Sequence, residues 1–377
     1  MNNPTKVSAA SPYFDTLSVN SILKEAEVSL TSGVLIDGPN TLKFEKEFAE
    51  YIGVKHAIAV NSGTSALEIL LRIYNVEGKE VIVPTNTFVA TPTAVLFSGG
   101  KPVFADIRKD TLCLDPSDLK RKITIKTAGV ILVHLAGLIC PQIKEVKKIC
   151  NDNNLFLIED AAHAHGAMID GQKAGGLCDG GAFSFYPTKV MTTGQGGMIT
   201  TNDSSIDTKA RSMRNHGLDS QRIMTMLGDN WCISEITAIL GRHQLANLEQ
   251  FLEKRIATAK IYDDLLKRNN SVFPIKKPDN VRHSYYKYPL ILEDVDKEQI
   301  ISAMKNEFGI DTGSLYYPPC HLHPWYKANL GTHEGDLPVS ETVLKQVLCL
   351  PIHPGITEDT AKYVVESLNL CIQKFKQ

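Results

Sequence analysis

The feature that most restricts how this chain can fold is a series of short apolar segments separated by stretches with helical periodicity. The apolar segments are residues 57–60, 80–83, 102–104, 129–133, 155–158, 182–185 and 197–200. They are mostly apolar rather than alternately polar, which is typical of strands that a parallel sheet buries on both faces. The pattern predicts an α/β fold in which a mostly parallel, mixed sheet lies between helices, with ligands at the carboxyl ends of the strands.

The segment before the first strand is expected to contain one helix. Asn40 is placed to cap this helix, Phe44 and Phe48 would lie on its buried face, and Gly53 would end it. The residues that precede Asn40 are expected to be irregular.

The second half of the chain indicates a smaller domain. A long helical pattern covers about residues 234–267, and its second half is expected to link two domains. After this helix, residues 285–288 alternate like a strand, and a proline-rich loop at 316–325 precedes a terminal helix. We therefore predict a large cofactor-binding domain at residues 1–250, including the N-terminal segment, and a small C-terminal α/β domain at residues 251–377, including the end of the linking helix.

Composition and charge fit a two-domain enzyme. A chain of 377 residues has the length of about two domains, and its formal net charge of -2 offers no electrostatic footprint for nucleic acid or an anionic membrane. The longest apolar stretch, residues 129–139, is shorter than the ~18 residues of a membrane span, and the first residues lack the apolar core of a secretory signal. Eight cysteines without a Cys-x-x-Cys pair indicate reduced thiols. We expect a cytoplasmic enzyme with no membrane or nucleic-acid partner.

A polar turn follows the first predicted strand. Residues 61–66 read Asn-Ser-Gly-Thr-Ser-Ala and join a strand to a helix, where free backbone amides and the helix dipole can bind an anion. Gly63 lets the backbone approach a ligand closely, and hydroxyl side chains follow it. A helix cap without a ligand would explain the same residues.

Acidic residues and histidines follow a later strand. Asp160 comes directly after an apolar segment, where its carboxylate would face the ligand crevice. Glu159 and Asp160 could instead be solvated or cap a helix. The spacing of His163 and His165 also fits a metal site, but two histidines without a third nearby ligand are a weak signal, and we predict no metal.

A lysine stands between an apolar strand and a glycine-rich turn. Lys189 precedes residues 194–197, Gly-Gln-Gly-Gly, so its amine could lie in a partly desolvated crevice rather than on the surface. Burial would lower the pKa of the amine from ~10.4 and leave a neutral nucleophile that forms Schiff bases with carbonyl cofactors. Ser184 lies five positions earlier, near enough to donate to the phosphate of the same ligand.

Taken in order, these clusters match the requirements of pyridoxal 5'-phosphate. The cofactor needs a phosphate cradle, a carboxylate that keeps its pyridine nitrogen protonated, and a lysine that carries it as an imine. Residues 61–66, then Asp160, and then Ser184 with Lys189 provide these groups. Their order, more than any one cluster, predicts a pyridoxal-phosphate enzyme.

Longer motifs occur in a recognisable order between about residues 33 and 365. They are residues 44–49 (FEKEFA), 61–67 (NSGTSAL), 83–91 (VPTNTFVAT), 159–164 (EDAAHA), 184–189 (SFYPTK), 214–217 (RNHG), 317–319 (YPP) and 350–355 (LPIHPG). In these motifs the whole chain resembles the DegT/DnrJ/EryC1/StrS family of sugar aminotransferases. The resemblance implies the aspartate aminotransferase fold (fold type I) and a pyridoxal-phosphate-dependent aminotransferase.

The resemblance implies roles for individual residues. Lys189 would form the internal aldimine with pyridoxal 5'-phosphate, and Asp160 would pair with its pyridine nitrogen. Phe88 would stack on the ring face, and His163 would lie against the ring hydroxyl. The residues expected to hold the phosphate are Gly63, Thr64, Ser65 and Ser184, together with Asn230 from the facing subunit of a homodimer whose active sites are shared.

Two positions depart from the family pattern. The usual Asn-x-Arg reads Asn230-Trp231-Cys232, so a cationic contact near the cofactor or the amino donor's carboxylate is missing, and the usual Glu in the glycine turn is Gln195. Both departures bear on donor and acceptor preference. Tyr317 and His321 in the proline-rich loop are candidates to line the sugar pocket, although the loop could equally be structural.

The resemblance further implies a two-stage amino transfer. An amino donor, by family habit L-glutamate, would react first, with Lys189 as general base and acid, and the acceptor would be a nucleotide-linked 3- or 4-keto-6-deoxyhexose. Three alternatives stay open. They are a dehydratase, which would carry His in place of Lys189, an aminotransferase acting on a cyclitol or another small ketone, and a catalytically silent regulatory or binding protein on the same scaffold.

Overall fold

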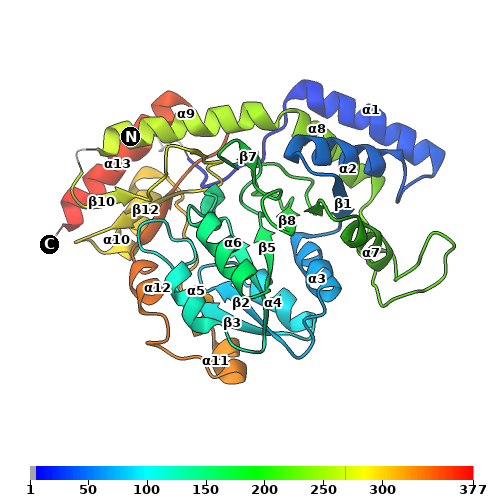
Figure 1. Ribbon diagram of the computed structural model, residues 1–377. Helices are drawn as coiled ribbons and strands as arrows, with labels where there is room; N and C mark the ends of the chain where they lie inside the picture. The colour runs from blue at the N-terminus through cyan, green and yellow to red at the C-terminus, as the bar shows by residue number, and fades with distance from the viewer. Residues whose placement is uncertain (1–5, 268, 377) are drawn as a thin grey trace.

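The computed structural model describes residues 6–267 and 269–376. Its large domain contains a seven-stranded sheet in the order β1-β9-β8-β5-β4-β2-β3 (Figure 1). The strands are β1 (His56–Val60), β2 (Glu80–Pro84), β3 (Lys101–Ala105), β4 (Thr127–Val133), β5 (Phe156–Asp160), β8 (Gly180–Ser184) and β9 (Gly197–Thr201). Strands β2 to β5 and β8 are parallel, and β9 runs antiparallel to both β1 and β8. The predicted mostly parallel, mixed sheet is confirmed.

Alternate residues of the strands enter two different cores. In β1, Ala57 and Ala59 pack on one side of the sheet, while Ile58 and Val60 pack on the other. Helices α3 (Gly63–Ile73), α4 (Ala90–Phe97) and α7 (Ser204–Arg214) cover one face, and α2 (Pro39–Ile52), α5 (Pro116–Lys122), α6 (Ile143–Asp152) and α8 (Glu235–Ala246) cover the other. Burial on both faces explains why the strand segments are apolar throughout.

The C-terminal part of the chain forms a second, smaller core. An antiparallel sheet in the order β10-β12-β13 packs against three helices, which precede, interrupt and follow its strands along the chain. Its elements are β10 (Val272–Pro274), β12 (Tyr288–Leu292), β13 (Val347–Leu350), α9 (Leu248–Leu266), α10 (Lys297–Phe308) and α13 (Glu358–Phe375). Val7 pairs with Ile310 and belongs to this core, so the N-terminal segment reaches across to the small domain.

Short elements connect the two parts. They are β6 (Met168–Ile169), β7 (Gln172–Lys173) and β11 (Val281–Arg282), which form one small sheet, together with η1 (Leu135–Gly137), η2 (Cys320–Leu322), α11 (Pro324–Leu330) and α12 (Pro338–Val343). Across residues 6–267 and 269–376, none of the helices combines the length and apolar character needed to cross a bilayer.

Three local features differ from the predictions. Residues 16–32 form helix α1 (Thr16–Ser32) rather than an irregular segment, and Asp15 caps it by accepting from the Ser18 amide. The helix predicted at 234–267 is broken at Asn247, where the backbone leaves helical geometry (φ -101°, ψ 0°) between α8 and α9. The strand predicted from residue 285 begins only at Tyr288, because Tyr285 has a positive φ of 48°.

Helix α2 is capped by a carboxylate from a distant helix. Glu235, the first residue of α8, accepts hydrogen bonds from the amides of Gly38, Asn40 and Thr41, and from the Thr41 hydroxyl. The Asn40 side chain, predicted to be the cap, instead accepts a hydrogen bond from Arg242. A buried carboxylate binds these amides more strongly than an amide oxygen does, so tertiary structure displaces the local cap.

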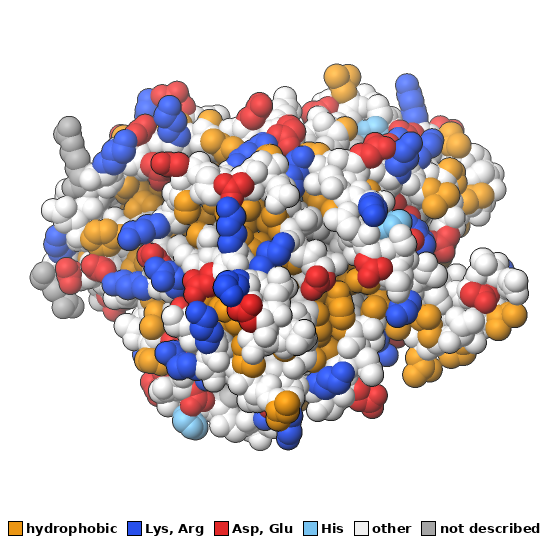
Figure 2. Space-filling model, in the orientation of Figure 1, with side chains coloured by type: hydrophobic (Ala, Val, Ile, Leu, Met, Phe, Trp, Pro, Cys, Tyr) orange, Lys and Arg blue, Asp and Glu red, His pale blue; other side chains and the backbone are white. Residues whose placement is uncertain are grey.

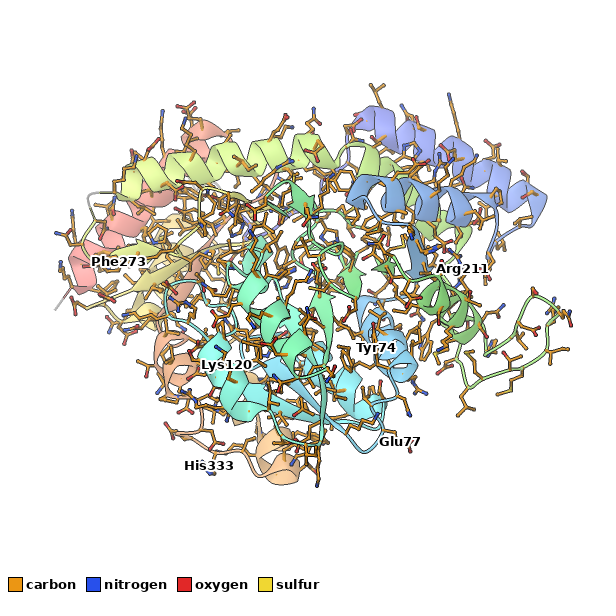
Figure 3. The ribbon with its side chains drawn as sticks, in the orientation of Figure 1. Tyr74, Glu77, Lys120, Arg211, Phe273 and His333 are labelled. Carbon is orange, nitrogen blue, oxygen red and sulfur yellow. The ribbon has the colours of Figure 1, made fainter. Side chains whose placement is uncertain are left out.

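Two motifs that lie outside the ligand edge hold the large domain together. Glu45 on α2 accepts hydrogen bonds from Arg211 and Arg214 on α7 and from the Ala59 amide in β1. Figure 3 labels Arg211 on α7, close to β1. The FEKEFA and RNHG motifs therefore meet as a buried ion-pair network.

Replacing Glu235 should destabilise the large domain. In Glu235→Ala the amides at the start of α2 lose a buried acceptor, so the free energy of unfolding should fall by about 3 kcal/mol. The midpoint of urea unfolding measures this loss. Glu253→Ala, at an exposed position on α9, is the control and should change stability by less than about 0.5 kcal/mol. An unchanged midpoint in Glu235→Ala would contradict the capping role.

Candidate active site

A cavity of about 490 Å³ lies at the carboxyl ends of the parallel strands. Its walls come from the turn after β1, the loop after β2, the ends of β4 and β5, the segment after β8, and the small domain. Its polar and aromatic lining consists of Ser62, Gly63, Thr64, Thr87, Phe88, Thr91, Asp160, His163, Ser184, Tyr186, Thr188, Lys189, Gln195, Tyr286, Lys287 and Tyr316. This is the edge at which an open α/β sheet binds ligands.

One end of the cavity is a cradle at the start of helix α3. The Ser62 side chain caps the helix by accepting from the Ser65 amide at 3.0 Å. The first amides of a helix have no partner within it, and Gly63 and Thr64 present theirs at the cavity wall. A Cβ on Gly63 would lie 2.8 Å from the Ser184 Cβ, so the absence of a side chain brings the turn against β8. The result is an anion site with Ser184 beside it.

Ser65 lies behind this cradle rather than in the cavity wall. Its hydroxyl donates to Asn61 Oδ1 at 2.6 Å and lies 2.8 Å from the Ser62 hydroxyl. Gly63, Thr64 and Ser184 therefore line the cavity. Ser65 instead holds the turn through its contacts with Asn61 and Ser62.

Asp160 ends strand β5 and is held by hydrogen bonds on both oxygens. Its Oδ2 accepts from the Thr91 hydroxyl at 2.7 Å, and its Oδ1 accepts from the Ala162 amide at 3.2 Å. Thr91 is in turn 2.7 Å from the Thr87 hydroxyl. These bonds orient the carboxylate in a buried position.

Lys189 follows β8 and projects into the same cavity. Burial lowers the pKa of its amine below the ordinary value, and the nearby Tyr286 and Asp160 only partly oppose this shift. A lysine in this state has a larger neutral fraction near pH 7 than a surface lysine has, which suits it for imine formation.

His163 lies in the EDAAHA motif and His165 directly follows it, and the two side chains lie in different surroundings. His163 lines the cavity, with Nε2 3.1 Å from the Tyr316 hydroxyl, and burial holds its pKa well below the usual range. His165 packs against Phe183 and Phe185 in the core, where burial lowers its pKa to about 3. Within the ranges that the structure describes, no cluster of three or more His, Cys, Asp or Glu forms a metal site.

Aromatic residues form the mouth of the cavity. Phe88 is 57% exposed and its ring lies 6.1 Å from the ring of Tyr316. Tyr186 is also exposed. Exposed rings at the rim of a polar cavity are positioned to pack against a flat ligand or a second chain.

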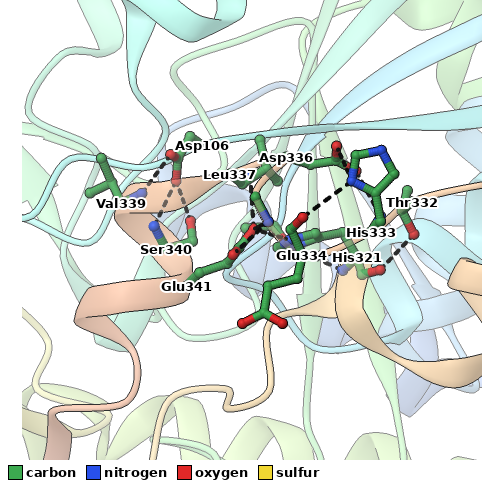
Figure 4. Close-up of polar contacts among 12 residues, drawn as sticks. Asp106, His321, Thr332, His333, Glu334, Asp336, Leu337, Val339, Ser340 and Glu341 are labelled. Carbon is green, nitrogen blue, oxygen red and sulfur yellow. Dashed lines mark hydrogen bonds and ion pairs between the residues drawn. The ribbon is translucent and has the colours of Figure 1, made fainter.

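The two residues predicted for a sugar pocket lie outside this cavity. The Tyr317 ring faces Lys297, whose Nζ is 5.0 Å from the ring centroid. His321 is buried, with Nδ1 2.8 Å from the Thr85 hydroxyl and Nε2 3.0 Å from Glu341. Figure 4 shows His321 beside Glu341 and, as a separate group of contacts, Asp106, which accepts hydrogen bonds from the first turn of α12. The proline-rich loop therefore contributes Tyr316 to the cavity, while His321 attaches the loop to the large domain.

Asn230 and Cys232 also lie away from the cavity of their own chain. Asn230 is exposed on the loop between α7 and α8. The Cys232 sulfur lies 3.5 Å from Asp37 Oδ2, and the same carboxylate pairs with Arg214 at 3.3 Å. The cation beside position 232 is therefore Arg214, at the end of α7, rather than an arginine at position 232 itself. Gln195, the second departure, lines the cavity.

Several cavity residues were not expected from the sequence, among them Thr91, Tyr286 and Tyr316. Thr91 ends the VPTNTFVAT motif and Tyr316 directly precedes the YPP motif, so both motifs were signals that pointed to them. Tyr286 lies in a segment whose pattern predicted only a strand. Nothing in that local pattern indicated that Tyr286 reaches the large domain.

Comparisons with known proteins agree with this geometry. The sequence pattern of the DegT/DnrJ/EryC1/StrS aminotransferase family matches residues 18–369. The chain belongs to this family. GDP-perosamine synthase of Caulobacter vibrioides is 35% identical to it, over 98% of this chain and 99% of that protein.

Solved structures of similar proteins cover the whole fold. Helicobacter pylori PseC, an aminotransferase involved in the biosynthesis of pseudoaminic acid, has a TM-score of 0.92 at 28% identity, over 98% of this chain and 100% of that one. The PLP-form of Spr1654 from Streptococcus pneumoniae has a TM-score of 0.91 at 25% identity, over 99% of both chains. The resemblance seen in the motifs is thus confirmed, and fold type I with it.

Membership of this aminotransferase family implies pyridoxal phosphate as the cofactor, and the residues present fit it. The anion cradle at α3 suits a phosphate, the buried Asp160 suits a protonated ring nitrogen, and Lys189 suits an aldehyde. All three line one cavity, as a single small cofactor requires.

Narrowing the cradle should weaken cofactor binding. A Cβ on Gly197 would lie 2.3 Å from the Ser62 carbonyl oxygen, so Gly197→Ala should displace the turn and weaken pyridoxal-phosphate binding at least about tenfold. Fluorescence titration of the cofactor-free protein measures the dissociation constant. Gly355→Ala, where the nearest atom would be the His353 ring at 3.2 Å, is the control and should bind normally. Equal affinity in folded Gly197→Ala would contradict the tight packing of the cradle.

Proposed function

We propose that the enzyme transfers an amino group from an amino acid, L-glutamate by the habit of the family, to a keto group of a nucleotide-linked 3- or 4-keto-6-deoxyhexose. The observation that carries the proposal is the convergence of the α3 cradle, Asp160 and Lys189 on one cavity. The similarity to a GDP-perosamine synthase supports a sugar nucleotide as acceptor. When bound, pyridoxal phosphate supplies an electron sink for charge that develops at the donor Cα.

Lys189 is proposed to bond covalently to the aldehyde of the cofactor and then to move protons. Because burial lowers the pKa of the amine, a neutral nucleophile is accessible near pH 7. Once the donor has displaced it, the same amine is free to accept the proton at the donor Cα and to deliver it to C4′ of the cofactor.

Asp160 is proposed to pair with the ring nitrogen. A carboxylate beside that nitrogen keeps it protonated and strengthens electron withdrawal. Thr91 and the Ala162 amide hold the carboxylate in place before the cofactor arrives, so little reorganisation is needed. Phe88 and His163 are proposed to contact the ring face and the ring hydroxyl.

A second copy of the chain is proposed to complete the site. Large apolar side chains are exposed on α1, on the segment before α2, at the start of α2 and on the loop after α7, namely Leu17, Leu23, Val28, Leu30, Val34, Leu35, Ile36, Leu42, Ile223, Met224 and Leu227. Figure 2 shows hydrophobic side chains on the lobe at lower right, where Figure 1 places the loop after α7. Such a surface is typical of an interface. Asn230 on this loop is proposed to reach the phosphate in the facing copy.

A cytoplasmic location is proposed as well. All eight cysteines lie within the ranges that the structure describes, and each is a free thiol. Thiols stay reduced in the cytosol, where small anionic substrates of this kind are also soluble.

Lys189→Ala tests the covalent bond. The wild-type protein should turn yellow with pyridoxal phosphate, and borohydride reduction should fix the cofactor on the peptide that contains residue 189. The variant should still bind the cofactor through the cradle but should lose the imine absorbance. Lys79→Ala is the control and should behave as wild type. Wild-type protein that binds no pyridoxal phosphate would refute the proposal.

An acceptor panel tests the substrate class. The pyridoxamine form of the enzyme is offered UDP-, dTDP- and GDP-linked ketosugars, together with a cyclitol ketone. Return of the pyridoxal spectrum with a sugar nucleotide is the expected outcome. A response to the cyclitol ketone alone would keep the aminotransferase activity and refute the sugar acceptor, and no response to any donor or acceptor would indicate a silent protein.

Mixing two inactive variants tests whether active sites are shared. Lys189→Ala removes the imine-forming amine, and Asn230→Asp places a negative charge where the facing copy would bind phosphate. If the site is shared, a mixed dimer carries both defects in one site and leaves the other intact. An equal mixture should then recover about a quarter of wild-type activity by random pairing. No recovery after verified exchange of subunits would refute the role of Asn230 in the facing copy.

A further inference from the structure

Tyr286 lies directly against Lys189 on the small-domain wall of the cavity. The Lys189 Nζ is 4.7 Å from the centroid of the Tyr286 ring. The phenol oxygen also lies 3.2 Å from the Thr188 hydroxyl. The ring stacks on His163 with centroids 4.2 Å apart. The phenol is buried and fixed on both sides, so its oxygen has a defined position beside the amine.

Positive charge surrounds this phenol. Besides Lys189, the Lys287 Nζ lies 6.0 Å from the ring centroid. Arg255 on α9 is 2% exposed and donates to two backbone carbonyl oxygens. Among the described residues, no carboxylate forms an ion pair with Arg255, and its charge lowers the pKa of Tyr286. Burial raises the pKa of Tyr286, but Lys189, Lys287 and Arg255 outweigh it and leave that pKa below the ordinary value.

Of the other titratable groups of the wall, Asp160 opposes this charge in part. His163 stays neutral, because burial lowers its pKa, and Tyr316 stays a phenol, because burial raises its pKa well above the usual value. Asp160 is the carboxylate in the cavity lining, and the proposed function assigns it to the ring nitrogen of the cofactor. Tyr286 is thus the group beside Lys189 that is free to gain or lose a proton.

We propose that Tyr286 is a further catalytic residue, which exchanges a proton with the Lys189 amine; this inference rests on the proposed function. In one arrangement an ammonium faces a phenolate, and in the other an amine faces a phenol. One proton passes from Lys189 Nζ to the Tyr286 oxygen, and the net charge of the pair is unchanged. The exchange makes the neutral amine available to the donor Cα without releasing a proton to water.

A purely structural role for Tyr286 would require only its ring. The stack on His163 and the contact with Lys189 are both made by the ring face, so Tyr286→Phe retains them. The variant removes the oxygen alone, and with it the proton exchange. It therefore separates the two roles.

The first test measures the pKa of Lys189 in the protein without cofactor. Competitive labelling with acetic anhydride over a range of pH, read by mass spectrometry of the Lys189 peptide, gives this value directly. A phenolate at Tyr286 raises the pKa of Lys189 through its charge, so Tyr286→Phe should lower that pKa by about one unit. Tyr285→Phe is the matched control, because its ring stacks on His283, and it should leave Lys189 unchanged. An unchanged pKa in folded Tyr286→Phe would overturn the inference.

Thermodynamic linkage supplies a second test. Lys189→Met removes the cation beside the phenol, so the pKa of Tyr286 should rise, by the same amount as Tyr286→Phe lowers that of Lys189. The ultraviolet absorbance of tyrosinate, taken as a difference from the double variant, follows this titration. No rise in the pKa of Tyr286 would show that the groups are not coupled and would overturn the inference.

The third test measures the chemistry of the loaded enzyme. Tyr286→Phe should slow the donor half-reaction about 10- to 100-fold and shift its pH profile, with little change in the KM of the donor. A wild-type rate and pH profile would overturn the catalytic role. Failure of the proposed function is recognised separately, because the wild-type protein would then bind no pyridoxal phosphate, whereas the two titrations need no cofactor.

Discussion

The site depends on close backbone packing where helix α3 begins. Gly63 lies against Ser184, and Gly197 lies against the Ser62 carbonyl, at separations that leave no space for a Cβ. This packing places the free amides of the helix beside the end of β8, and the chain then continues from β8 to Lys189. The anion cradle at the start of α3 and the Lys189 amine are therefore positioned by the sheet rather than by flexible loops. Rigid placement of this kind is what a covalently held cofactor requires.

Burial and charge then set the protonation of each group in the cavity. Asp160 is held in a fixed orientation because Thr91 and a backbone amide bind it. Lys189 loses basicity because it is desolvated, and His163 stays neutral for the same reason. The pKa of Tyr286 is lowered, whereas burial raises the pKa of most tyrosines, because cations lie close to the Tyr286 phenol. The pKa values of the amine and of the phenol are consequently both lower than usual within one small space.

The sequence motifs divide between chemistry and architecture. Glu45 and Arg214 come from two motifs, yet they meet as a buried ion pair that joins α2, β1 and α7. His321 follows a third motif and attaches the proline-rich loop through Thr85 and Glu341, which leaves Tyr316 at the cavity. Exposed apolar residues lie on α1 and on the loop after α7, where the proposed second copy of the chain would pack. A residue within a motif is therefore not by itself a residue of the site.

By itself the sequence determined the α/β sheet, its ligand edge, and the cavity positions of Gly63, Thr64, Asp160, Ser184 and Lys189, because apolar strands and the residues directly after them are encoded locally. Tertiary structure alone decided that Glu235 caps α2, that Tyr316 and not Tyr317 faces the cavity, and that Tyr286 reaches Lys189. These contacts join residues about 100 to 200 positions apart, or depend on which way one side chain of an extended loop points. Local periodicity carries no information about such contacts, since tertiary packing creates them, within the large domain for Glu235 and between the domains for Tyr286.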